Sequence, residues 1–248
     1  MGKYWKALGD CQSPWYWQLC DDAVVLLHWL FPATCYLCLD PGQPPALDLC
    51  AGCEGDLPRN ESACPVCAAP VPHPSASCRR CRRRGRAFDL AIAPYRYGFP
   101  LVELIHRLKY RGQLPIARIL GCLLGRRVAE LGAPQVDAIV PVPLHVARER
   151  KRGYNQAREI AVFAARELGL PVRHRLARRV RATGEQAMLP AHARRHNLKD
   201  AFIVSGKPPE RVAIVDDVLT TGATAESLAL ALRRAGCRRI EVWAVARA

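Results

Sequence analysis

Short apolar runs, bounded by polar or turn-forming residues, recur through the C-terminal two thirds of the chain. They lie at residues 138–142, 201–204, 212–215 and 240–246, and the segments 88–97 and 172–180 also have a strand-like pattern. Continuous apolar runs of this length are typical of strands that are buried on both faces of a parallel sheet. We therefore predict strands at these positions.

Helical periodicity separates the runs. Residues 100–111 place Leu101, Leu104, Ile105 and Leu108 on one face, with Arg107 and Lys109 pointing outward. Similar apolar stripes occur in further segments, at residues 23–30, 114–131, 156–168 and 225–235. Strands that alternate with helices predict an α/β domain with a mainly parallel sheet and helices on both faces.

The most informative stretch is residues 211–224, RVAIVDDVLTTGAT. A buried strand is expected to end at Asp216 and Asp217, and Val218 and Leu219 lead into a small polar turn before a helix. Such a turn lies at the carboxyl end of a strand, where open α/β sheets bind ligands. The turn consists of Thr220, Thr221, Gly222, Ala223 and Thr224.

This turn has the features of a phosphate-binding loop. Helix N-termini present unpaired N–H donors, threonine adds hydroxyl donors, and Gly222 permits close approach. No lysine follows the glycine, so it is not a Walker loop. The carboxylates of Asp216 and Asp217 suit sugar hydroxyls, directly or through Mg²⁺. The alternative is a buried strand followed by an ordinary threonine-capped helix.

A second strand end is followed by a basic loop, residues 145–154, which leads into a helix. Its cations suit a pyrophosphate leaving group, and the alternative is a solvated loop. Residues 181–200 show no regular pattern and are predicted to form a lid. The residues assigned to pyrophosphate and lid are Arg148, Arg152, Gly153, Asn155, Gln156, Gln186 and Arg194.

Eight of the 12 cysteines form four C-x-x-C pairs, and three spacers of nearly equal length separate the pairs. Two such pairs make a tetrahedral Cys₄ site, so two structural Zn²⁺ sites are predicted, without catalytic positions. Sequential pairing is the simpler arrangement, and a cross-braced one stays open. Disulfides are the alternative, which a reducing compartment disfavours. The ligands are Cys35, Cys38, Cys50, Cys53, Cys64, Cys67, Cys78 and Cys81.

The net charge of the chain suggests one further class of binding partner. The 248 residues carry a formal net charge of +15, which favours polyanions. Residues 79–86 contain six arginines, which suit nucleic-acid phosphates or form a solvated face. No apolar run is long enough to span a membrane, and the late apolar run at 23–31 does not predict a signal peptide.

Residues 211–224 resemble the phosphoribosyl-pyrophosphate (PRPP) signature of type I phosphoribosyltransferases. Residues 24–247 as a whole resemble the ComF (competence protein F, GntX-like) family. The resemblance rests on the C-x-x-C array, LIHRLKY at 104–110, PVPL and RGYNQ within 141–156, QAMLPAHARRHNL at 186–198, and the PRPP signature. It implies that Asp216 and Asp217 are the catalytic acids and bind the ribose hydroxyls, and that residues 220–224 bind the 5′-phosphate. With Val218 and Leu219 between them, these residues form the expected PRPP-binding segment.

The resemblance further implies a cytoplasmic protein that is linked in some members to DNA uptake and to a helicase-like competence ATPase. Residues 1–34 are expected to form an extension with a short helix, 35–86 a double zinc ribbon, and 87–248 the phosphoribosyltransferase-like domain. Two functions remain open. One is Mg²⁺-dependent phosphoribosyl transfer from PRPP. The other is a non-catalytic module that senses PRPP or binds single-stranded DNA or a protein.

Overall fold

The computed structural model describes residues 33–42, 47–73, 77–132, 135–181 and 201–248. The N-terminal extension with its predicted helix, and the predicted lid residues Gln186 and Arg194, lie outside these ranges. The chain divides into two compact units, residues 1–55 and 56–248. The division falls between the first four metal-ligand cysteines and the last four, so the second cysteine group shares a unit with the α/β domain.

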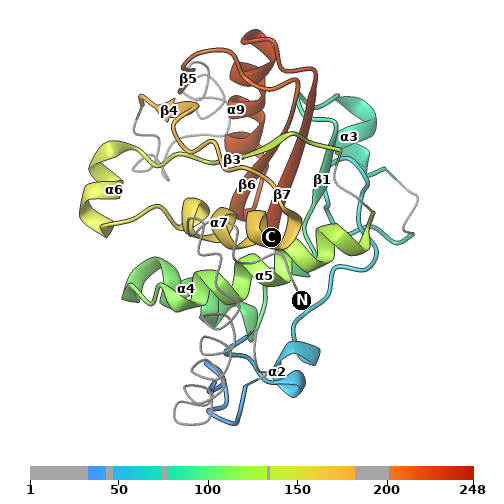
Figure 1. Ribbon diagram of the computed structural model, residues 1–248. Helices are drawn as coiled ribbons and strands as arrows, with labels where there is room; N and C mark the ends of the chain where they lie inside the picture. Colours follow the sequence, from blue (N-terminus) through green and yellow to red (C-terminus); the bar gives the residue numbers. More distant parts are fainter. Residues whose placement is uncertain (1–32, 43–46, 74–76, 133–134, 182–200) are drawn as a thin grey trace, which may run out of the picture. The chain divides into compact units, whose positions relative to one another are not determined.

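A five-stranded parallel sheet forms the centre of the second unit (Figure 1). The strand order is β1-β7-β6-β3, and β2 also pairs with β7. Pro94 lies between β1 and β2, which therefore follow one another along the same neighbour. The strands are β1 (Leu90–Ile92), β2 (Tyr95–Arg96), β3 (Ala138–Pro141), β6 (Arg211–Leu219) and β7 (Arg239–Arg247).

The two central strands, β6 and β7, confirm the expectation of burial on both faces. Residues 212–215 of β6 and 242–246 of β7 are fully buried. The predicted end of β6 at Asp216 is wrong, because Asp216, Val218 and Leu219 still pair with Ala244, Ala246 and Arg247 of β7. The acids therefore lie within the strand, and the polar turn begins only at Thr220.

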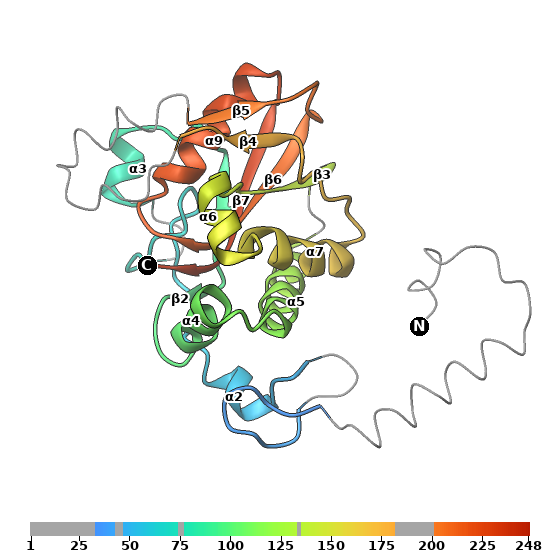
Figure 2. The same ribbon diagram turned by 90° about the vertical axis from the view of Figure 1, so that its left-hand side faces the viewer.

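Helices cover both faces of the sheet, as the sequence predicts (Figure 2). One face is covered by α7 (Gln156–Leu168) and α5 (Pro115–Glu130), and α4 (Leu101–Arg111) packs on α5. On the other face, α9 (Ala223–Arg234) packs its Leu228 and Leu232 against Val212 and Ile214 of β6. None of the helices in the described ranges is long and apolar enough to cross a membrane.

Two predicted elements are corrected. Within residues 172–180 only β4 (Ala177–Arg179) is a strand, and it pairs in antiparallel fashion with β5 (Phe202–Val204) in a separate two-stranded sheet. The predicted basic loop contains a short helix, α6 (Val146–Arg152). His145 caps this helix by accepting a hydrogen bond from the Ala147 amide, and Gly153 ends it in a left-handed conformation.

Close packing of α5 on α7 depends on Gly121. A Cβ atom at this position would lie 2.6 Å from the Ile160 carbonyl oxygen and 2.6 Å from Phe163 Cβ. Gly121→Ala is therefore expected to lower the free energy of unfolding by about 1–3 kcal/mol, despite the better helix propensity of alanine. Urea unfolding would measure this change in stability. The control is Gly85→Ala, because a Cβ atom at Gly85 would meet nothing within 4 Å. Equal midpoints for the two variants would contradict the prediction.

Candidate functional site

The predicted phosphate loop, residues 220–224, connects the carboxyl end of β6 to the N-terminus of α9. Gly222 has a φ of +76°, a conformation that suits glycine, and no side chain caps the helix there. The Thr221 hydroxyl accepts a hydrogen bond from the Ala223 amide at 3.3 Å. Thr220 and Thr221 are exposed. The helix start, with the exposed Thr220 and Thr221 before it, offers N–H and hydroxyl donors to an anion.

Asp216 lies just before this loop and is partly exposed. Its Oδ1 accepts a hydrogen bond of 2.9 Å from the Asp217 amide. Burial, followed by the neighbouring Asp217 charge, raises the pKa of Asp216 well above its usual value. An ionised Asp216 would therefore be stabilised by a nearby cation or by additional hydrogen-bond donors.

Asp217 occupies a different environment, because consecutive strand residues point to opposite faces. Its residue exposure is only 4%, and its carboxylate forms an ion pair with Lys109 Nζ of α4. The expectation that Lys109 points outward is wrong. Lys109 follows Leu101 and Ile105, both buried, by eight and four residues, so helical spacing places it on their face. This spacing in the sequence could have predicted that Lys109 lies on the buried face of the helix.

Two arginines approach the same end of β6 from other elements. Arg179 of β4 is half-buried, and its pKa is lowered by burial and by Arg148 and raised by Asp216. These effects place the Arg179 charge near that of Arg148 and near that of Asp216. Residue 145, just before α6, also forms a parallel bridge with Arg179. The sequence pointed to Arg148, whereas Arg179 lies within a separate segment predicted as a strand, residues 172–180, and carried no motif.

The other residues predicted to bind pyrophosphate make contacts within the fold. The Arg152 guanidinium donates a hydrogen bond to the Gln156 side chain and lies 5.9 Å from the centroid of the Tyr110 ring. Asn155 caps α7 by accepting a hydrogen bond from the Ala157 amide, and it donates another to the Val142 carbonyl, both at 3.0 Å. Gly153 ends α6. These contacts shape the segment, and their assignment to pyrophosphate stays a prediction.

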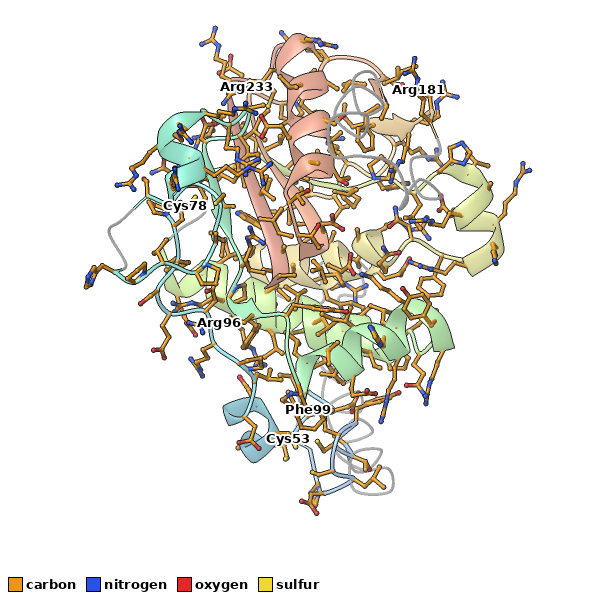
Figure 3. All side chains as sticks on the ribbon, turned by 180° about the vertical axis from the view of Figure 1, so that it is seen from behind. Cys53, Cys78, Arg96, Phe99, Arg181 and Arg233 are labelled. Carbon is orange, nitrogen blue, oxygen red and sulfur yellow. The ribbon has the colours of Figure 1, made fainter. Side chains whose placement is uncertain are left out.

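The described cysteines gather into two clusters in sequential order. Cys35, Cys38, Cys50 and Cys53 form one, and Cys64, Cys67, Cys78 and Cys81 form the other; all ligand atoms within each cluster lie within 4.8 Å of one another. Figure 3 labels Cys53 and Cys78, one from each cluster. The sequential arrangement is therefore the observed one, and all eight thiols are free of disulfides.

Both clusters fit zinc. A tetrahedral site with Zn–S distances of about 2.3 Å has sulfur–sulfur edges of about 3.8 Å. Cys38 Sγ and Cys50 Sγ are 3.6 Å apart, as are Cys67 Sγ and Cys78 Sγ. Backbone amides also point at sulfur, with Cys53 N 3.4 Å from Cys50 Sγ and Cys78 N 3.3 Å from Cys64 Sγ. These donors stabilise thiolates, and the two clusters are closed structural sites.

Each cluster is expected to hold its zinc independently. Native mass spectrometry should find two zinc atoms per chain, and Cys35→Ser with Cys38→Ser should leave one. Strong chelation should unfold the cysteine segments, because their Gly-, Pro- and polar-rich spacers bury little apolar surface. Fewer than two zinc atoms in wild-type protein would contradict the assignment.

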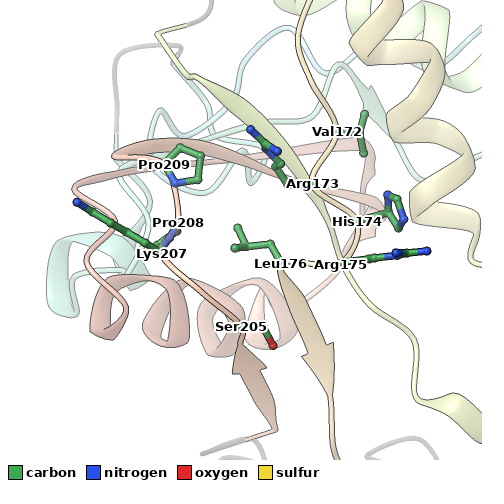
Figure 4. A pocket seen from close by; sticks show the side chains of 9 residues that line it. All are labelled: Val172, Arg173, His174, Arg175, Leu176, Ser205, Lys207, Pro208 and Pro209. Atoms are coloured by element: carbon green, nitrogen blue, oxygen red, sulfur yellow. The ribbon is translucent and has the colours of Figure 1, made fainter.

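A separate pocket of about 640 Å³ lies between residues 172–176 and 205–209 (Figure 4). Val172 bridges to Ile139 near the start of β3, and residue 209 lies two residues before β6 begins. The pocket is therefore near the amino ends of the strands, whereas the phosphate loop is at a carboxyl end. None of the predicted site residues lines it. Its cationic lining consists of Arg173, Arg175 and Lys207, and His174 also lines it.

Comparison with known proteins places the chain in a family. Competence protein F of Haemophilus influenzae is 36% identical over 210 residues, which cover 81% of this chain and 90% of that protein. The chain belongs to the ComF family. The DNA utilization protein YhgH of Salmonella typhi is 35% identical to this ComF-family chain over 222 residues. The alignment covers 87% of this chain and 97% of YhgH. The model for a double zinc ribbon domain matches residues 26–82.

Among solved structures, the Bacillus subtilis glutamine PRPP amidotransferase complexed with ADP and GMP aligns with 51% of this ComF-family chain and 26% of its own chain. The identity is 20% and the TM-score 0.35, too low to bear on function. The family assignment therefore rests on the relatives.

Proposed function

We propose that this protein binds PRPP with Mg²⁺ and transfers its phosphoribosyl group to an acceptor. The observation that carries the proposal is the gathering of three groups at the carboxyl end of β6. A helix N-terminus with threonine hydroxyls follows the strand, and Asp216 lies within the strand near its carboxyl end. Arg179 of β4 approaches Asp216, and Arg148 of α6 lies near Arg179. An anion site, a carboxylate and a cation pair match a phosphate, a diol and a pyrophosphate.

The transfer breaks the bond between C1′ and the pyrophosphate oxygen, and it forms a bond between C1′ and the acceptor nucleophile. Positive charge develops at C1′ as pyrophosphate departs with the bonding electrons, as in glycoside chemistry. The guanidinium groups of Arg148 and Arg179 would stabilise the departing anion. The loop would hold the 5′-phosphate and Asp216 a ribose hydroxyl. A proton on the acceptor nucleophile is released to solvent in this scheme.

The carboxylates fit a magnesium ion that arrives with PRPP. Mg²⁺ is usually held by one or two protein carboxylates together with substrate phosphates and water. Asp216 is partly exposed and available, whereas Asp217 is paired with Lys109. When bound, Mg²⁺ would neutralise charge on the leaving pyrophosphate. Asp216 is thus the primary carboxylate of the site, and Asp217 contributes through the buried ion pair beside it.

The names of the relatives support a role in competence or DNA utilisation. A phosphoribosyl transfer there would belong to nucleotide metabolism that accompanies DNA uptake, in the cytoplasm, with a competence helicase as partner. Membership of the family and the two zinc ribbons are consistent with this setting.

Pyrophosphate release distinguishes an enzyme from a binding module. Zinc-loaded protein would be incubated with PRPP, Mg²⁺ and a panel of purine, pyrimidine and amine acceptors, and pyrophosphate would be measured with a coupled phosphatase assay. Acceptor-dependent release that Asp216→Asn abolishes is the expected result. PRPP binding without release for any acceptor would favour the non-catalytic function.

A second function, binding of single-stranded DNA, is favoured by the exposed arginines of α3 (Arg79–Arg83) and the segment after it. Arg82, Arg83 and Arg84 are exposed, and α3 has no acid in its first turn. Replacing these three by Gln should weaken oligonucleotide binding and flatten its salt dependence. The matched control removes three charges at the separate pocket, Arg173, Arg175 and Lys207. An equal effect of both triple variants would indicate diffuse charge attraction, and no effect of either would exclude this surface.

A further inference from the structure

The second zinc ribbon contacts the phosphate loop through arginine side chains. Arg80, on α3 between the ligands Cys78 and Cys81, donates a hydrogen bond of 3.2 Å from Nη1 to the Thr221 carbonyl oxygen. Thr221 is the second residue of the loop, and its carbonyl belongs to the same peptide group as the amide of Gly222. A tether on this carbonyl fixes the orientation of that peptide, because the peptide group is planar.

Arg86 secures the first turn of α9. Its side chain is only 7% exposed, and its Nη1 lies 3.4 Å from Glu226 Oε2. The other oxygen of Glu226 accepts a hydrogen bond of 2.8 Å from the Ala87 amide. Arg86 follows the ligand Cys81 by five residues in the chain. Its guanidinium therefore links the segment that leaves the second zinc cluster to the start of the helix whose N–H groups would bind phosphate.

A third arginine joins the same two regions from β7. Arg247 donates from Nη1 to the Leu219 carbonyl at 2.8 Å and from Nε to the carbonyl of the ligand Cys67 at 3.2 Å. Leu219 is the last strand residue before the loop. The loop is thus held just before its start by Arg247, at Thr221 by Arg80 and at its helix by Arg86.

We propose that the second zinc ribbon is a positioning element for the phosphate loop, with Arg80 and Arg86 as its positioning residues. The inference rests on the proposed PRPP function and deepens it. Zinc at Cys64, Cys67, Cys78 and Cys81 holds α3, and α3 carries Arg80 to the loop. Phosphate-ligand affinity therefore depends on occupancy of the second zinc site. The first cluster lies in the other compact unit and is the natural comparison.

The test compares Arg80→Ala with Arg86→Gln against a control, Arg79→Ala with Arg82→Ala, in the full zinc-loaded chain. The control removes the same number of charges from the same segment, at exposed residues. Hydrogen–deuterium exchange would follow amides 219–226 without ligand, and calorimetry would give the PRPP dissociation constant. Losing two charge-assisted tethers should raise loop exchange and the dissociation constant by about 10-fold or more in the test pair alone.

The two readouts separate this inference from the proposed function. Faster loop exchange in the test pair, with no PRPP binding even by wild type, would keep the positioning role and overturn the PRPP assignment. Unchanged loop exchange would overturn the positioning role whatever the affinity. As an independent arm, Cys64→Ser with Cys67→Ser should expose the loop amides, whereas Cys35→Ser with Cys38→Ser should leave them protected. Equal loop protection in both cysteine variants would also overturn it.

Discussion

Lys109→Met is expected to lower the free energy of unfolding by about 3 kcal/mol, because it leaves a buried carboxylate without its counter-charge. Asp217 has a side chain that is 5% exposed, and that of Lys109 is 18% exposed. Neither group is solvated well enough for bulk water to replace the partner fully. Urea unfolding of the zinc-loaded protein would measure the change, with Lys151→Met, at an exposed position on α6, as the control.

A double-mutant cycle isolates the ion pair. Asp217→Asn alone should be milder than Lys109→Met, because the more exposed ammonium can reach water. Adding Asp217→Asn to Lys109→Met should recover most of the lost stability, since no buried charge then remains. Additive losses in the double variant would show that the two side chains do not interact, and would remove Lys109 from the site.

Asp216→Asn combined with Asp217→Asn is expected to raise the dissociation constant for PRPP with Mg²⁺ by about 100-fold, the effect of losing charge-assisted bonds to hydroxyls and metal. An amide is a weaker acceptor than a carboxylate and a poor magnesium ligand. Stability should change less than affinity. Burial and the neighbouring charge already raise the Asp216 pKa, so the neutral side chain relieves a repulsion.

Asp137→Asn is the matched control for this pair. Asp137 lies at the amino end of the sheet, just before β3, and pairs with Arg211 at 2.6 Å. Asp137 is exposed and lies at the opposite end of the strands from the phosphate loop. Its replacement should therefore leave PRPP affinity unchanged. A similar loss of affinity in the control and in the double variant would point to a general effect of charge.

The sequence was sufficient for the features that depend on local pattern. Apolar runs located the central strands, helical spacing located α4, α5, α7 and α9, and the C-x-x-C spacing indicated the sequential cysteine clusters. Strand boundaries depend also on pairing with neighbouring strands. The run of apolar residues in β6 stops at Val215, but pairing with β7 continues the strand to Leu219, because sheet hydrogen bonds do not require apolar side chains.

The features that the sequence did not reveal depend on contacts between distant segments. Lys109 and Asp217 are brought together by the packing of α4, and Arg80 meets Thr221 across 141 positions of the chain. The arginines of residues 79–86 also differ in their environment. The Arg86 side chain is buried and paired with Glu226, whereas Arg82 is exposed to solvent. Composition alone gives both the same charge, so only the fold distinguishes a positioning residue from a solvated one.

Titration calorimetry of the wild-type, zinc-loaded protein with PRPP tests the central proposal most directly. Binding is predicted in the presence of Mg²⁺, and chelation of Mg²⁺ under conditions that leave zinc in place should weaken it strongly. Ribose 5-phosphate should compete, because it offers the same phosphate and hydroxyls to the loop and Asp216. Absence of binding by folded protein that contains two zinc atoms would contradict the assignment of the site at the carboxyl end of β6.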